Sequence, residues 1–303
     1  MPELEPFRKY VQHWLEKNCP RSIRSPYPSE SDMIWGGRNA TFKTEDQKHW
    51  LNNMAAQGWT VPHWPKQYGG GGLDKEQHKI LRQELANLNC RPPLESFGIS
   101  MLGPALLEYG SEAQKLTYLP QIARGEIRWC QGCSEPGAGS DLASLQTRAD
   151  DQGDHFIVNG AKVWTSYADK SDWIFCLVRT DREASKHKGI SFLLFDMQTP
   201  GVSTAPIQLI SGESPFCETF FNNVKVPKEN IVGDINRGWD IAKYLLTHER
   251  EMISSMGLDS KQQNLVDIAV ENIGLKQEGQ KQATLANTIL RTDLARFTVD
   301  EEA

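Results

Sequence analysis

The spacing of hydrophobic residues changes twice along this chain of 303 residues, near Gly125 and again near Gly233. Before Gly125 and after Gly233, apolar residues recur with the period of an amphipathic helix. Between these points they form short runs bounded by turn residues, which is typical of strands. We therefore predict an α+β fold. Its expected parts are an N-terminal all-α domain over residues 1–124, a middle antiparallel β-barrel domain over 125–233, and the start of a C-terminal α-helical bundle over 234–303.

Capping signals mark the helices of the first part. Thr44 with Gln47, and Ser111 with Gln114, have the spacing of a capping box, and a further helix is expected from about Asp74 to Asn89. Four consecutive glycines occupy positions 69–72, but no Lys-Ser/Thr pair follows them. This excludes a typical phosphate loop, so we expect a flexible turn there.

The middle part contains an Asn-Gly pair between two short apolar runs, at positions 159–160. Such a pair is the strongest short-range indication of a β-hairpin. Four further strand-like runs follow at regular spacing, over residues 172–180, 189–197, 201–210 and 218–227. Short strands in this arrangement favour a barrel or a sandwich.

Composition excludes several classes of protein. The net charge of −6 argues against nucleic acid or an anionic membrane as the main partner. No apolar run approaches the roughly 20 residues of a membrane span, and the N-terminus lacks a secretory signal, so we expect a cytoplasmic location. Cys130 and Cys133 form a single C-x-x-C without a second ligand pair, so we expect six reduced thiols and no metal.

The segment Trp129–Ala149 (WCQGCSEPGAGSDLASLQTRA) holds a turn of small residues over positions 136–140. Glycine lets the backbone approach a ligand, and free N–H groups in such a turn bind anions or ring oxygens. Ser134 and Ser140 add hydroxyl donors. A tight connection between a helix and the first strand explains the same residues equally well.

A second segment, NGAKVWTSYADKSDW, places Trp164 beside Thr165 and Ser166. A large flat ring next to two hydroxyl groups suits a planar heterocycle, with the ring packed on it and the hydroxyls at its edge. A core tryptophan at a strand end is the simpler alternative.

Together these segments resemble the acyl-CoA dehydrogenase family. The resemblance rests on CSEPGAGSD (133–141) and NGAKVWTS (159–166), and on the later blocks GISFLLFDM, ETFFNNVKVP and GWDIAKYLLTHER. It covers essentially the whole chain. It implies an FAD-dependent enzyme that dehydrogenates an acyl-CoA thioester to the 2-enoyl-CoA and passes electrons to an electron-transferring flavoprotein. A homodimer or homotetramer is implied as well.

The resemblance also implies roles for individual residues. The residues expected to bind FAD are Gln131, Cys133, Ser134, Gly139, Ser140, Trp164, Thr165 and Ser166. Those expected to contact substrate are Ser140, Thr247 and Arg250.

Glu249 is the expected catalytic base, and it matches one of the two positions where the family carries it. Leu245 and Leu246 lie one helical turn before it and Ile253 one turn after, so an apolar face would desolvate the carboxylate and raise its pKa. The neighbouring Glu251 points roughly 200° away around the helix. A solvated glutamate paired with a nearby lysine or arginine is the alternative.

The family typically continues with more helices than residues 234–303 supply, so we expect either a fragment or a short form completed by another chain. Two rival functions stay open. One is a flavin oxidase or monooxygenase that uses dioxygen, and the other is a non-catalytic subunit for acyl-CoA binding or assembly. The acyl group is not specified, and medium, branched and ring-bearing thioesters are all compatible with the sequence.

Overall fold

The computed structural model describes residues 4–259, 275–276, 284–285 and 288–302. Within these ranges it describes no side chain at residues 30, 248, 249, 251–259, 275–276, 284–285, 288 and 297–302. The chain divides into two compact units, Met1–Glu249 and Arg250–Ala303, which are taken separately below.

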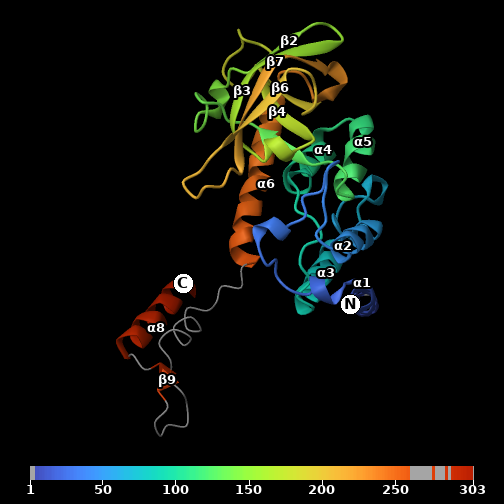
Figure 1. Ribbon diagram of the computed structural model, residues 1–303, viewed down its shortest axis with the longest axis vertical. Helices are drawn as coiled ribbons and strands as arrows, with labels where there is room; N and C mark the ends of the chain where they lie inside the picture. Colours follow the sequence, from blue (N-terminus) through green and yellow to red (C-terminus); the bar gives the residue numbers. More distant parts are fainter. Residues whose placement is uncertain (1–3, 260–274, 277–283, 286–287, 303) are drawn as a thin grey trace. The chain divides into compact units, whose positions relative to one another are not determined.

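Helices form the first part of the larger unit, as predicted. They are α1 (Leu4–Asn18), α2 (Glu45–Ala56), α3 (Lys75–Asn87), α4 (Gly103–Tyr109) and α5 (Glu112–Ala123), with a π-helical turn over Gly98–Leu102 before α4. Their starts follow the capping signals, because Thr44, Asp74 and Ser111 each accept a hydrogen bond from the backbone N–H three residues on. In Figure 1 these five helices lie together, with α4 and α5 next to the strands.

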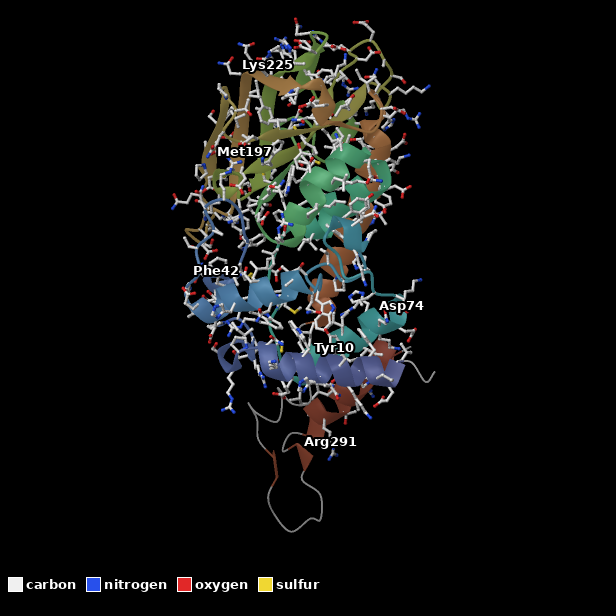
Figure 2. All side chains as sticks on the ribbon, turned by 90° about the vertical axis from the view of Figure 1, so that its right-hand side faces the viewer. Tyr10, Phe42, Asp74, Met197, Lys225 and Arg291 are labelled. Carbon is white, nitrogen blue, oxygen red and sulfur yellow. The ribbon has the colours of Figure 1, made fainter. Side chains whose placement is uncertain are left out.

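The core of these helices is aromatic and aliphatic. Val11 and Leu15 of α1, Trp50 of α2 and Leu81 of α3 are fully buried against one another. Each such side chain contributes about 1.5–3 kcal/mol by leaving water. The exposed Tyr10, labelled in Figure 2, lies at the edge of this cluster with its ring against Trp59.

The glycines at positions 69–72 form a packed connection, so the expected flexible turn is wrong. Gly70 and Gly71 are buried. A Cβ on Gly70 would lie 2.1 Å from the carbonyl oxygen of Trp64, and the Gly72 N–H donates to that same oxygen over 2.9 Å. Glycine is needed here because two backbone segments approach closely.

The predicted middle β domain is confirmed. Its strands are β1 (Trp129–Gly132), β2 (Arg148–Asp151), β3 (His155–Ser166), β4 (Trp173–Arg179), β5 (Ile190–Asp196), β6 (Val202–Ile207), β7 (Phe216–Pro227) and β8 (Ile231–Val232). They form one sheet in the order β6-β7-β3-β2-β4-β5-β8, and β1 pairs with β4. The pairing is antiparallel except for β1 and β2 against β4. Because β6 and β8 end the order, hydrogen bonds between the described strands do not close a complete barrel.

The Asn159-Gly160 pair does not form the predicted hairpin. It lies inside the twelve-residue strand β3, where the register to β7 shifts. Gly160 has φ +150°, and a Cβ there would lie 2.6 Å from Thr147 Oγ1. Asn159 also accepts the Asn223 N–H over 2.9 Å, so the pair forms a β-bulge that bends the strand.

Helix α6 (Gly238–Asp259) follows the sheet, as the helical periodicity predicted. In the second unit, β9 (Leu275–Lys276) pairs with β10 (Thr284–Leu285), and α8 spans Thr288–Glu302. The helical pattern expected after Gly233 is therefore interrupted at residues 284–285, which are engaged in strand pairing. Among the described helices, none has the length and apolar character needed to cross a membrane.

Candidate active site

Strand β3 and the loop after β1 bring the two sequence motifs together. The Val163 N–H donates to the Ser134 carbonyl over 2.9 Å, and Lys162 Nζ donates to the Cys133 carbonyl over 3.1 Å. The loop also closes on itself, since Glu135 and Ala138 exchange two backbone hydrogen bonds of 3.0 Å. The two motifs therefore form one structural unit, although they lie far apart in sequence.

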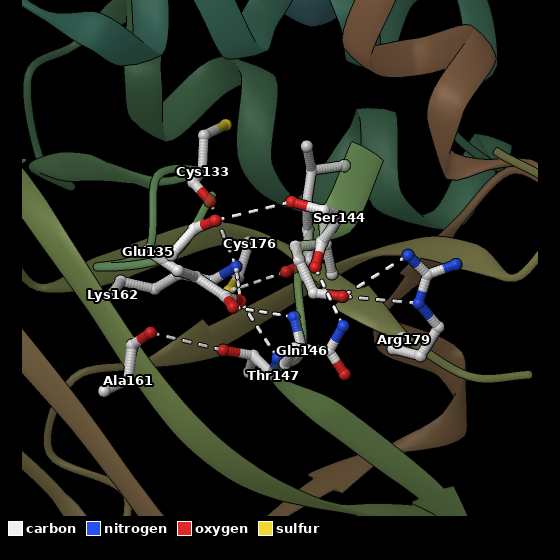
Figure 3. A network of polar contacts seen from close by, with 12 residues as sticks. Cys133, Glu135, Ser144, Gln146, Thr147, Ala161, Lys162, Cys176 and Arg179 are labelled. Carbon is white, nitrogen blue, oxygen red and sulfur yellow. Dashed lines mark hydrogen bonds and ion pairs between the residues drawn. The ribbon is translucent and has the colours of Figure 1, made fainter. Parts of the chain in front are cut away.

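A buried ion pair lies beneath this loop (Figure 3). Lys162 Nζ is 2.8 Å from Glu135 Oε1, and the side chains are 0% and 7% exposed. The carboxylate also accepts the Gln146 N–H over 2.6 Å and the Thr147 N–H over 2.9 Å. Burial alone would raise the pKa of Glu135, but Lys162 and the two N–H donors together outweigh burial and hold the pKa below its ordinary value.

Arg179 of β4 holds the other end of the same loop. Its guanidinium donates to the carbonyl of Ala143 over 2.7 Å and to the Leu145 carbonyl over 3.3 Å, while Nη1 donates to the Lys186 carbonyl over 2.9 Å. Figure 3 shows Arg179 and Lys162 approaching the loop from opposite sides. Two buried cations thus fix a segment that has little regular secondary structure of its own.

The end of β3 has an unusual backbone. The register to β7 shifts between Lys162 and Thr165, which marks a second bulge. Trp164 has φ 60° and Tyr167 has φ 51°, in the left-handed region that large side chains rarely adopt. Each such residue costs about 1–3 kcal/mol, and strain of this kind concentrates at functional sites.

A cavity of about 570 Å³ opens where these elements meet, a volume typical of ligand sites. Its lining residues are Gln131, Cys133, Ser134, Gly139, Ser140, Leu142, Val163, Trp164, Ser166, Phe216, Trp239 and Leu246. The Trp164 indole is 55% exposed and stands edge-on to Phe216, at 6.0 Å between ring centroids. One wall is therefore aromatic and another carries hydroxyl and amide groups.

Seven of the eight residues expected to bind FAD line this cavity. The eighth, Thr165, is fully buried on the opposite side of β3 from Ser166, because side chains alternate along a strand. Its Oγ1 finds no hydrogen-bond partner among the described residues. The structure thus brings seven predicted residues together, while their roles stay predictions.

The expected substrate residues are placed differently from one another. Ser140 lines the cavity, whereas Thr247 is exposed and its hydroxyl donates to the Lys243 carbonyl within α6. Arg250 is exposed and begins the second unit. The backbone of Glu249 belongs to α6, but its side chain lies outside the described residues.

Sequence reasoning did not assign several lining residues. Phe216, Trp239 and Leu246 come from β7 and α6, far from either motif. Trp239 and Leu246 belong to the segment after Gly233 that was predicted to be helical, but nothing local identified Phe216. In the described part of the chain, no three His, Cys, Asp or Glu side chains form a group that could hold a metal ion, and all six cysteines are free thiols.

Two family models match the chain. Residues 2–126 match the acyl-CoA dehydrogenase N-terminal domain, and residues 130–224 match the acyl-CoA dehydrogenase middle domain. Acyl-CoA dehydrogenase IpdE1 of Mycobacterium tuberculosis is 36% identical over 274 residues, which cover 89% of this chain and 69% of that protein. The chain belongs to the acyl-CoA dehydrogenase family. This is a family of flavin-dependent oxidoreductases, in agreement with the resemblance found in the motifs.

Solved acyl-CoA dehydrogenase structures share the fold. A structure described as the Tcur3481-Tcur3483 steroid ACAD has a TM-score of 0.73 and 32% identity, covering 100% of this chain and 73% of that one. The glutaryl-coenzyme A dehydrogenase structure with glutaryl-CoA has a TM-score of 0.68 and 28% identity, covering 100% and 74%. The order of an N-terminal helical part, a middle sheet and a following helix is therefore that of the family.

Proposed function

We propose that this chain uses FAD to dehydrogenate an acyl-CoA thioester to the 2-enoyl-CoA and passes the electrons to an electron-transferring flavoprotein. The observation that carries the proposal is the cavity between the loop after β1, the end of β3 and α6. It gathers seven residues that the family resemblance assigns to the flavin. The domain limits at 124 and 233, and a homodimer or homotetramer, are parts of the same proposal.

The residues at the cavity fit an isoalloxazine ring. Trp164 offers a flat surface that is 55% exposed, held by strained backbone at a bulge. Hydroxyl groups of Ser134, Ser140 and Ser166 lie in the walls, where they can meet the oxygens and nitrogens of a ring edge. A Cβ at Gly137 or Gly139 would meet no atom within 4 Å, so the turn presents its backbone to open space. A pyrophosphate group could approach it closely.

When bound, FAD would accept the β-hydrogen of the thioester with its electron pair. The chain must supply the base for the α-proton, and we assign this role to Glu249. Leu246 lines the cavity, and Glu249 follows it by three residues in the same helix. Positions three apart share a helix face, so the spacing from Leu246 supports the assignment of the base to Glu249.

The remaining roles concern binding. We assign Ser140, Thr247 and Arg250 to the acyl-CoA, with the arginine suited to a phosphate group. Holding the thioester against the ring fixes the α- and β-carbons in reacting position, which supplies much of the rate enhancement.

The base is tested by comparing two neutral variants in the same helix. Glu249→Gln should keep FAD bound but lose reduction by acyl-CoA, because an amide cannot take the α-proton. Glu251→Gln is the matched control, since it removes the same charge from the opposite helix face and should be reduced at the wild-type rate. Stopped-flow absorbance of the flavin measures both. Reduction of Glu249→Gln at the wild-type rate would refute the assignment.

The electron acceptor is tested separately. An air-saturated reaction with an acyl-CoA should yield little hydrogen peroxide, and an electron-transferring flavoprotein should accelerate turnover. Stoichiometric peroxide would instead assign the chain as an oxidase. A colourless protein that binds CoA esters without dehydrogenating them would assign it as a non-catalytic subunit.

A further inference from the structure

Two cysteines that are far apart in sequence meet at the edge of the N-terminal helical core. Cys19 directly follows α1 and Cys90 lies in the segment after α3, and these two helices lie side by side (Figure 1). The two Sγ atoms are 3.1 Å apart and share an S–H hydrogen bond. Cys19 belongs to the buried cluster around Trp50 and Leu81, and Cys90 packs against that cluster. Neither cysteine lines the cavity at Trp164.

The backbone holds both cysteines in place. The N–H groups of Cys19 and Cys90 donate to the carbonyls four and five residues earlier, over 2.8 Å and 2.9 Å. A few residues further on, the Arg91 N–H donates to the Ile23 carbonyl over 3.1 Å and joins the two segments. A disulfide needs a sulfur–sulfur distance of about 2.05 Å, so the two sulfur atoms would have to approach by only about 1 Å.

The surroundings favour a thiolate at Cys19. The S–H of Cys90 donates to this sulfur and, with a smaller effect of Arg24, lowers the pKa of Cys19, although the side chain is only 3% exposed. The Arg24 guanidinium also donates to the Cys19 carbonyl over 3.0 Å and 3.2 Å. Because Glu16 pairs with Arg24 at 2.8 Å and offsets part of its charge, the Cys90 thiol is the main cause. The thiolate, and not the thiol, is the form of cysteine that reacts.

The thiols buried in the sheet have the opposite character. Cys130, Cys176 and Cys217 belong to the core of the β domain, and burial raises the pKa of each of these thiols. A buried thiol of this kind ionises less readily and reacts slowly. Oxidation is therefore expected at the contact between α1 and the segment after α3 before it occurs in the sheet.

We propose that Cys19 and Cys90 form a reversible disulfide when the protein meets hydrogen peroxide, and that this bond fastens the end of α1 to the segment after α3. The Cys19 thiolate attacks one peroxide oxygen, the O–O bond breaks, hydroxide leaves and a sulfenic acid forms. The Cys90 sulfur then attacks the Cys19 sulfur, so that the S–S bond forms, the S–O bond breaks and a second hydroxide leaves. The two hydroxides take up the two thiol protons as water, and two electrons pass from the sulfur atoms to the peroxide.

The expected consequence is a more stable protein. The two cysteines are 71 positions apart, so the disulfide would close a long loop and restrict the unfolded chain. The melting temperature should therefore rise by roughly 5–15 °C on oxidation. This effect does not require a flavin or an acyl-CoA, so its test is independent of the proposed dehydrogenase activity.

The test compares the full chain before and after treatment with a small excess of hydrogen peroxide. Remaining thiols are blocked with N-ethylmaleimide, and the proteolytic peptides are analysed by mass spectrometry without reduction. A peptide pair that joins Cys19 to Cys90 should appear in the treated protein and disappear with dithiothreitol. Thermal unfolding should show the rise in melting temperature, and dithiothreitol should reverse it.

Three variants assign the effect to this pair. Cys19→Ser and Cys90→Ser should each lose both the joined peptides and the rise in melting temperature. Cys133→Ser is the matched control, because it removes the other partly exposed thiol and should keep both signals.

The proposal is overturned if the treated wild type contains no peptide pair joining Cys19 to Cys90, or if Cys19 is converted to a sulfinic or sulfonic acid instead. A joined pair without a rise in melting temperature, or a rise that persists in Cys90→Ser, would contradict it as well. Cys19→Ser places a hydroxyl group in the core. If that variant does not fold, the partly exposed Cys90→Ser and the peptides of the wild type decide the question.

Discussion

Removing the buried Lys162 beneath the loop after β1 should cost both stability and FAD affinity. In Lys162→Met, the Glu135 carboxylate, only 7% exposed, loses its counter-ion and keeps two N–H donors. Breaking a buried pair costs about 3–5 kcal/mol, and the remaining donors place this case near the lower limit, at about 3 kcal/mol. For a protein of this size, that corresponds to a fall in melting temperature of roughly 6–12 °C.

The double variant Glu135→Gln/Lys162→Met separates stability from positioning. It buries no charge, so the free energy of unfolding should return to within about 1–2 kcal/mol of the wild type. The loop still lacks the contacts of Lys162 to Cys133 and Glu135, so FAD should bind about tenfold more weakly in the double variant as in the single one.

Urea unfolding of the apoprotein gives the stabilities, and quenching of flavin fluorescence gives the FAD affinity. Lys228→Met serves as the control, because its pair with Asp151 is about 40% exposed on both sides and water screens it. A Lys162→Met variant that unfolds like the wild type would show that the buried pair does not stabilise the fold. A double variant that regains full FAD affinity would show that the pair acts on stability alone.

Three further predictions concern low pH, Trp164 and Gly160. The pKa of Glu135 is lower in the folded protein than its ordinary value of 4.5. The ionised Glu135 therefore contributes its full stabilisation above pH 4.5, and this stabilisation is lost as the pH falls through the lower folded pKa. Unfolding curves below pH 4.5 should show the loss in the wild type but not in Glu135→Gln. Trp164→Ala should weaken FAD binding roughly tenfold, because the flavin loses its aromatic contact. The melting temperature should change little, because the indole is 55% exposed. An FAD affinity equal to that of the wild type would contradict a cofactor site at Trp164. Gly160→Ala should destabilise the sheet by about 2 kcal/mol or more, because its Cβ would lie 2.6 Å from Thr147 Oγ1; an unchanged melting temperature would contradict this.

Local sequence was sufficient for the helix starts and for most strands. Ser111 and Gln114 form the full capping box that their spacing predicts, because the interactions lie within one helical turn. The same kind of local information gave a wrong prediction at Gly160, where a hairpin was expected and a β-bulge is found. An Asn-Gly pair favours left-handed and extended backbone in a bulge as well as in a turn, and only the pairing of β3 with β7 decides between them.

The residues proposed to bind FAD were predicted from the family motifs, while the contacts that hold these residues in place were not. Glu135 and Lys162 are 27 positions apart, and only the fold shows that both are buried and paired. Phe216 and Leu246 reach the cavity from separate elements, so no local pattern identifies them. Gly70 and Gly71 illustrate the same limit, since the backbone atoms that lie against them belong to residues 58–64.

The central claim is that the cavity beside Trp164 holds a flavin which acyl-CoA reduces. The most direct measurement is anaerobic titration of the FAD-loaded protein with straight-chain, branched and ring-bearing acyl-CoA thioesters, following the visible flavin absorbance. At least one of them should bleach the flavin stoichiometrically. A protein that retains its yellow colour in the presence of every thioester, or that binds no FAD at all, would contradict the central claim.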